Sequence, residues 1–148
     1  LMLVGTPLDN EDPYYIEFMR VVKRHPEIEY VSQVERSEIP ALYRQIDALI
    51  CCSIDDPLPV VVTECFMFGK TVIISSGSGQ YYMVRDGYNG YSYRKSDVNE
   101  LCDKMKLAWL ARNDEAMGEH ARKLYTSKFT TCVFEERLMS YTNELIMS

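Results

Sequence analysis

Two carboxylates beside one apolar run are the residues of this chain best placed to do chemistry. Asp56 lies in the segment Asp56-Pro57-Leu58-Pro59, and Glu64 follows eight residues later. The run predicts a helix over about 59–68, whose first turn presents unpaired N–H groups and a partial positive charge that attract phosphate. Carboxylates on either side of that phosphate could bind hydroxyl groups. Hydroxyl, phosphate and hydroxyl in this order are typical of a nucleotide sugar.

Short apolar runs alternate with helical patterns along the chain, which indicates an α/β fold. The expected strands are 1–4, 28–31, 48–52, 71–74 and an edge strand at 90–93. The expected helices between them are 13–25, 37–46, 59–68 and a short one at 80–84. Such alternation implies parallel strands, right-handed crossovers and helices on both faces. We therefore predict one Rossmann-like domain over 1–148, with a parallel sheet of about five strands and extra C-terminal helices.

The loops at the carboxyl ends of the strands are those that matter, because ligands of such sheets bind there. These loops are 5–6, 33–35, 53–58 and 75–79. Asp56 lies on this rim, and Glu64 is about one and a half helical turns from it. The helix of Glu64 is apolar nearly all round, which predicts burial, so its carboxylate needs a partner that ligand hydroxyls could supply. Without a ligand, Asp56 would only cap the helix and Glu64 would be solvated.

The segment 56–74 resembles the donor-binding signature of family-4 (group 1) GT-B glycosyltransferases. There, too, two acids eight residues apart precede a short apolar helix, a glycine and a buried strand. Gly5 after the first strand, Asp86-Gly87-Tyr88-Asn89-Gly90 and the closing helices follow in the expected order, so the resemblance covers about 5–141. It implies the carboxyl-terminal, donor-nucleotide-binding half of a GT-B fold.

The resemblance also implies a role for each matching residue. Glu64 would accept hydrogen bonds from the nucleotide ribose, and Asp56 would contact the donor sugar. The N–H groups of Leu58 and Val60 would approach the diphosphate, and residues 33–34 would lie near the base. Family members typically need no metal, and no catalytic residue is assigned within this chain. The residues expected to bind the donor are Gly5, Thr6, Gln33, Val34, Asp56, Leu58, Val60 and Glu64.

Departures from the family pattern leave other functions open. Asp56 replaces the usual Glu, Pro59 removes one N–H from the loop, and Tyr82 stands where Glu is common. The Arg and Lys that bind the diphosphate in the family precede the position of Gly5 and are not in this chain. One alternative is half of a GT-B nucleotide-sugar epimerase. Another is a non-catalytic module that binds a nucleotide or a partner.

The start inside a strand-like run, residues 1–4, leads us to expect a fragment of a longer two-domain protein. A missing amino-terminal Rossmann-like domain would supply the acceptor half of the cleft and any catalytic base. The 148 residues alone would then be inactive, whereas the full protein would transfer a sugar from a nucleotide-diphosphate sugar to a hydroxyl of an acceptor glycan or lipid-linked glycan. Polysaccharide biosynthesis is typical of the family.

Composition excludes several classes. The net charge is −6 and the basic residues are scattered, which disfavours nucleic-acid binding and a polybasic membrane patch. Five Cys without C-x-x-C spacing and two distant His support neither a disulfide framework nor a zinc site. We expect buried free cysteines in a reducing cytoplasm, with Cys51 and Cys52 facing opposite ways. No run has the length of a membrane span, so any membrane association would come from missing parts.

Three helices are expected after residue 96, starting at Asp97, Asp114 and Thr131. Their apolar residues recur at helical spacing and are predicted to face the core. These residues are Val98, Leu101, Cys102, Met105, Ala108 and Trp109 in the first helix, Met117, Ala121, Leu124 and Tyr125 in the second, and Phe134, Leu138, Tyr141 and Leu145 in the third.

Overall fold

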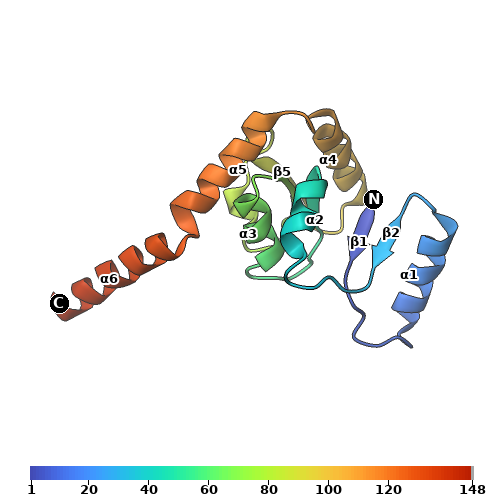
Figure 1. Cartoon of the computed structure of the whole chain (residues 1–148), viewed down its shortest axis with the longest axis horizontal. Helices are drawn as coiled ribbons and strands as arrows, with labels where there is room; N and C mark the ends of the chain where they lie inside the picture. Colours follow the sequence, from blue (N-terminus) through green and yellow to red (C-terminus); the bar gives the residue numbers. More distant parts are fainter. Residues whose placement is uncertain (148) are drawn as a thin grey trace. The chain divides into compact units, whose positions relative to one another are not determined.

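Strands and helices alternate along the chain in the computed structural model, which describes residues 1–147 (Figure 1). The elements are β1 (Met2–Val4), α1 (Pro13–Arg24), β2 (Glu29–Val31), α2 (Ile39–Gln45), β3 (Ala48–Cys51), α3 (Val60–Met67), β4 (Thr71–Ser75), a 3-10 turn at Tyr81–Met83, β5 (Gly90–Tyr93), α4 (Val98–Leu110), α5 (Glu115–Lys128) and α6 (Thr131–Met147). The chain forms two compact units, 1–42 and 43–148, and each is described separately below.

The first unit pairs β1 with β2 in parallel, with Leu3 opposite Tyr30. Helix α1 connects the two strands. It begins as predicted, because the Asp12 carboxylate accepts a hydrogen bond from the N–H of Tyr14 at 2.7 Å and Pro13 occupies the first turn. The ring of Phe18 on α1 packs edge-on against Tyr30, with centroids 5.3 Å apart. This aromatic contact attaches the helix to the small sheet.

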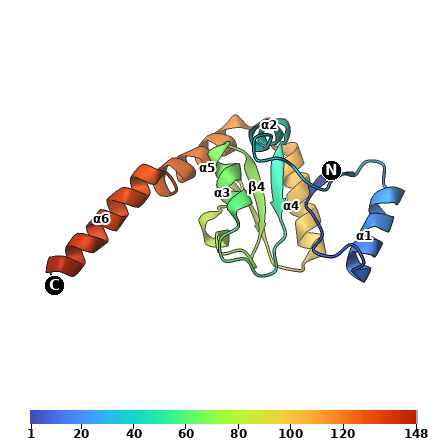
Figure 2. The same ribbon diagram turned by 60° about the horizontal axis from the view of Figure 1, so that its bottom comes forward.

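The second unit holds a parallel sheet in the order β3-β4-β5. Strand β5 is an edge strand, as predicted, and the α/β class with parallel strands is confirmed. Within residues 1–147 the strands form a two-stranded sheet, β1-β2, and a three-stranded sheet, β3-β4-β5. Residues 72–75 of β4 are all buried, which requires cover on both faces. Figure 2 shows α3 and α4 on opposite sides of β4.

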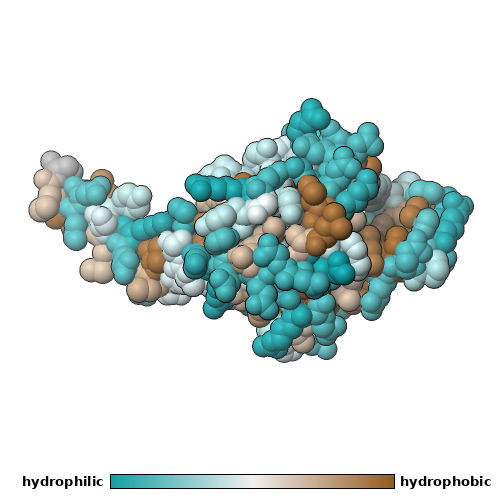
Figure 3. All heavy atoms as spheres, turned by 90° about the horizontal axis from the view of Figure 1, so that it is seen from above, coloured by the Kyte–Doolittle hydropathy of each residue, from teal (hydrophilic) through white to brown (hydrophobic). Residues whose placement is uncertain are grey.

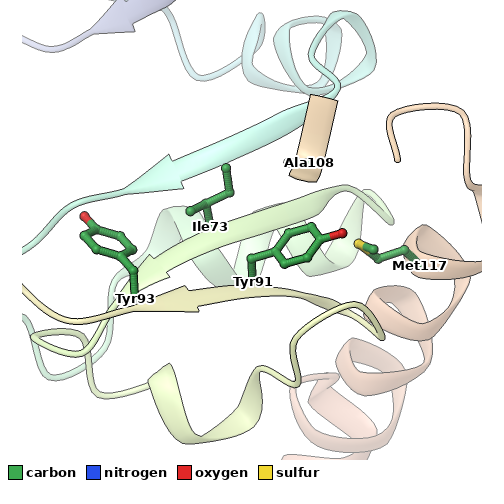
Figure 4. Close-up of a cluster of buried hydrophobic side chains, with 5 residues drawn as sticks. All are labelled: Ile73, Tyr91, Tyr93, Ala108 and Met117. Atoms are coloured by element: carbon green, nitrogen blue, oxygen red, sulfur yellow. The ribbon is translucent and has the colours of Figure 1, made fainter. Parts of the chain in front are cut away.

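The buried cluster on one face of this sheet joins both strands to the C-terminal helices. Ile73 of β4 and two tyrosines of β5, Tyr91 and Tyr93, pack with Ala108 of α4 and Met117 of α5 (Figure 4). Leu101 and Met105 of α4 pack against the same cluster and are partly buried. The stripe predicted for α4 is therefore confirmed for its central residues.

Other residues of that stripe face solvent. Val98 and Trp109 are 69% and 61% exposed, and Cys102 is also exposed, so their predicted burial is wrong. At 100° per residue they lie beside the Leu101–Met105–Ala108 line, and the sheet covers only that line. The Arg112 guanidinium lies 4.2 Å from the centroid of the Trp109 ring and partly covers it.

Helix α6 differs most from its prediction. On α5, Met117 and Ala121 are buried and Leu124 and Tyr125 are partly buried, as expected. On α6, by contrast, Phe134 is 63%, Leu138 53%, Tyr141 64% and Leu145 78% exposed. Figures 1 and 2 show α6 extending away from the sheet of its unit, and Figure 3 shows apolar side chains among polar ones along it. Helical spacing predicts an apolar face, but it does not supply a surface to cover that face.

The five cysteines are all free. Cys51 and Cys65 are buried, as predicted. Burial is wrong for Cys52, Cys102 and Cys132, because Cys52 follows the end of β3 and the other two occupy solvent-facing sides of their helices.

Candidate functional site

The loop that carries Asp56 is held by the loop that follows the next strand. The N–H of Asp56 donates to the carbonyl of Gly77 at 3.0 Å, and the N–H of Gly79 donates to the carbonyl of Asp56 at 2.8 Å. The Ser75 hydroxyl donates to the carbonyl of Ser53. Since both loops leave the carboxyl ends of neighbouring parallel strands, these bonds place Asp56 on the rim where such sheets bind ligands.

Two glycines allow this close approach. A Cβ at Gly77 would lie 2.3 Å from the carbonyl oxygen of Ile54, and a Cβ at Gly79 would lie 2.0 Å from that of Pro57. Both distances are far inside van der Waals contact, so any side chain would separate the loops. The segment Gly77-Ser78-Gly79 therefore serves loop packing.

The Asp56 side chain caps its own loop. Its Oδ1 accepts a hydrogen bond from the N–H of Leu58 at 3.1 Å, the geometry of an Asx turn. The residue that caps α3 is Pro59, which has no side-chain acceptor. Within residues 1–147 the N–H groups of Val60 and Val61 have no acceptor, as expected for a first helical turn. Of the two predicted phosphate donors, Leu58 is thus already engaged and Val60 is available.

Helix α3 is not buried all round, which corrects the sequence-based expectation. Val62, Cys65 and Phe66 are fully buried, but Val60 is 66% and Val61 45% exposed. One side of the helix packs on β3, β4 and α5, and hydropathy alone does not distinguish it from the other side. The exposed side leaves the first turn of α3 accessible next to Asp56.

The Glu64 carboxylate has a hydrogen-bond partner within the protein, and the sequence did not indicate the residue that supplies it. The Tyr43 hydroxyl, on α2, lies 3.1 Å from Glu64 Oε2 and 2.9 Å from the carbonyl oxygen of Val61. Burial and the charge of Glu64 raise the pKa of Tyr43 well above its ordinary value, so the phenol stays protonated and donates. An aromatic residue in a short helix carries no local signal of this contact.

A buried amide contacts the residue that precedes the acid on α3. Gln80 is 1% exposed, and its Nε2 donates to the hydroxyl of Thr63 at 2.7 Å. Its Oε1 has no hydrogen-bond partner within the described residues. Since Thr63 precedes Glu64 on α3, this contact also anchors the turn that carries the acid.

The remaining predicted residues belong to the first unit. The N–H of Gly5 donates to the carbonyl of Val31 at 3.1 Å, and the Thr6 hydroxyl donates to that of Ser32. These bonds bring the loop after β1 beside the loop after β2, where Gln33 and Val34 follow. The predicted donor residues thus form two groups, one in each unit.

Residues 1–147 contain no group of three or more metal-binding side chains. None of their helices combines the length and the apolar character needed to cross a membrane.

Residues 2–124 match the family of glycosyl transferases group 1. This chain belongs to the group 1 glycosyltransferase family. Two characterised relatives are a trehalose synthase of Pyrococcus horikoshii, 26% identical over 98% of this chain, and spore coat protein SA of Bacillus subtilis, 24% identical over 89%. The group 1 chain covers 36% of each relative's length, so it spans little more than a third of them.

Solved structures show the same fold. Anabaena HepE in complex with UDP superposes with a TM-score of 0.84 at 20% identity, over 97% of this chain and 40% of HepE. The C-terminal domain of the group 1 glycosyltransferase LpcC from Francisella tularensis superposes with a TM-score of 0.77 at 18% identity, over 88% of this chain and 69% of that domain. The resemblance to the carboxyl-terminal half of a GT-B glycosyltransferase is confirmed.

Proposed function

We propose that this chain binds the nucleotide-diphosphate sugar donor of a glycosyltransferase. The observation that carries the proposal is the accessible first turn of α3, where the unpaired N–H groups of Val60 and Val61 lie between the carboxylates of Asp56 and Glu64 in sequence. Helix N-termini bind phosphate through such groups. Solved complexes of HepE with UDP and with UDP-glucose support a donor of this class.

In this proposal Glu64 accepts hydrogen bonds from the ribose and Asp56 contacts the donor sugar. The diphosphate lies at the N–H groups of Val60 and Val61, with the Leu58 backbone beside it. In the first unit we assign Gln33 and Val34 to the nucleotide base, and Gly5 and Thr6 to donor binding. No metal is part of the proposed site.

We propose that the whole protein is longer than this chain, because the relatives are almost three times as long as the part that matches. We place the acceptor site and the catalytic base in a further amino-terminal Rossmann-like domain, with a glycan or lipid-linked glycan as acceptor. The 148 residues alone are then inactive.

Two activity measurements test this assignment. Sugar transfer by this chain alone would contradict it. Release of an isomerised nucleotide sugar by the longer protein, in the absence of an acceptor, would indicate an epimerase.

A titration with UDP, GDP, ADP and dTDP, followed by amide NMR, tests the donor site. We expect one nucleotide to shift the amide resonances of Val60 and Val61. Removal of the carboxylate in Glu64→Ala should weaken binding at least about tenfold, since hydrogen bonds to charged groups contribute about 1.5–3 kcal/mol.

The matched control is Glu119→Ala, which removes an exposed carboxylate from α5 and should bind as the wild type does. A dissociation constant of 1 mM corresponds to a binding free energy of about 4 kcal/mol. If the wild type does not bind even at millimolar nucleotide, the proposed function is overturned. Unchanged affinity of the Glu64→Ala variant would also overturn it.

A further inference from the structure

The Glu64 carboxylate has one side-chain hydrogen-bond partner among residues 1–147, the Tyr43 hydroxyl at 3.1 Å from Oε2. Glu64 is partly buried, and the next two residues of α3, Cys65 and Phe66, are fully buried, which restricts the direction of its carboxylate. Among the described residues, this hydroxyl is thus the side-chain group that contacts Oε2, and no side-chain donor contacts Oε1.

The position of that hydroxyl is itself fixed by packing. Tyr43 is only 4% exposed, and its ring stacks on Phe68 with centroids 5.0 Å apart and planes within 5°. Phe68 ends the same helix that carries Glu64. Tyr43 thus contacts both Phe68, at the end of α3, and Glu64 within it. Its ring cannot move unless this packing is broken.

The hydroxyl also has a second acceptor. The carbonyl oxygen of Val61 lies at 2.9 Å, slightly closer than the carboxylate. A phenol carries one proton, so it can serve either oxygen by rotating about its C–O bond while the ring stays in place. Glu64 can therefore receive or lose this hydrogen bond without rearrangement of α2 or α3.

We propose that Tyr43 is a positioning residue for ribose recognition, holding Glu64 Oε2 so that Oε1 is directed to the vicinal hydroxyls of a bound ribonucleotide. This role rests on the proposed function. Tyr43 does not touch the nucleotide; it acts through the carboxylate. Its removal should therefore reduce the preference for ribose more than it reduces binding of the phosphates.

The test compares the nucleotide that binds with its 2′,3′-dideoxy analogue, in the wild type and in Tyr43→Phe. The substitution keeps the ring and its stack on Phe68. We expect affinity for the ribonucleotide to fall about tenfold, the loss expected for one hydrogen bond to a charged group, and affinity for the dideoxy analogue to stay nearly constant. A merely structural role would weaken both ligands equally.

Two further variants make the result specific. Tyr91→Phe removes the hydroxyl of another buried tyrosine of the same unit, 7% exposed, and should leave the ribose preference unchanged. In a Glu64→Ala background, Tyr43→Phe should have no further effect on the ribose preference, because the group through which it acts is gone.

A measurement without substitution covers the case in which Tyr43→Phe does not fold. In protein with ¹³C-labelled tyrosine rings, the ribonucleotide but not its dideoxy analogue should shift the Tyr43 resonance. An unchanged ribose preference in Tyr43→Phe, or an unresponsive Tyr43 resonance, overturns this inference. A wild type that binds no nucleotide instead overturns the proposed function.

Discussion

The two acids of the site differ in what holds them. Asp56 stabilises its own loop through the N–H of Leu58, whereas Glu64 is held by Tyr43 from another helix. The short side chain of Asp suits the Asx turn, which an extra methylene would disturb. The Asp that replaces the family's usual Glu thus has a local structural role in this proline-containing loop.

The structural role of Asp56 and its proposed contact with the donor sugar can be separated by Asp56→Asn. Asn supports the same Asx turn but carries no charge, so we expect the free energy of unfolding to change by less than about 0.5 kcal/mol. Binding of the nucleotide sugar should weaken severalfold, with nucleotide diphosphate binding unchanged. Calorimetric titration with both ligands measures this. Equal weakening of both ligands would show that the carboxylate acts on the phosphate region and not on the sugar.

At the scale of elements, α3 packs on α5 through a close backbone contact between Gly69 and Gly118. Gly69 has a φ of +62°, the left-handed conformation that ends α3, and its carbonyl oxygen faces Gly118 in α5. A Cβ at position 118 would lie 2.3 Å from that oxygen. The helix that carries Glu64 therefore packs on α5 through backbone atoms as well as through side chains.

Gly118→Ala tests this contact. In an exposed helix, Gly→Ala would raise the free energy of unfolding by about 1 kcal/mol. Here we expect the free energy of unfolding to fall by about 1–3 kcal/mol, because the added methyl group overpacks the contact. Urea unfolding gives the value, with Ser127→Ala on the exposed side of α5 as a control that should stay within about 0.5 kcal/mol. A stabilised Gly118→Ala protein would mean that the two helices can separate freely.

For the whole molecule, α6 is the element least needed by the described fold. Its residues Phe134, Leu138 and Tyr141 are each more than half exposed, and the match to the group 1 family ends at residue 124. Buried apolar area is what stabilises a helix in a protein, and α6 has no buried residue.

A chain that ends after Thr130 should therefore keep its stability. We expect the free energy of unfolding to change by less than about 1 kcal/mol, because exposed side chains gain little on folding. Thermal or urea unfolding followed by circular dichroism measures it. A loss above about 3 kcal/mol would show that α6 packs on the rest of the chain in solution.

Local patterns in the sequence predict the elements and part of the site. Asp12-Pro13 begins α1, and the apolar run in β4 predicts a strand covered on both faces. The spacing of Asp56 and Glu64 indicates a helix start between two acids, and the family resemblance follows from the same residues. These features depend on neighbours within a few positions, where capping, chain stiffness and side-chain period act directly.

Only the tertiary structure decides which surfaces meet. Tyr43 and Glu64 are 21 residues apart, and no period or motif links them before α2 and α3 pack together. The stripe on α6 has the same spacing as the buried line on α4, yet one is exposed and the other covered. Amphipathic spacing encodes the face of a helix, whereas burial depends on whether another element supplies an apolar surface to match it.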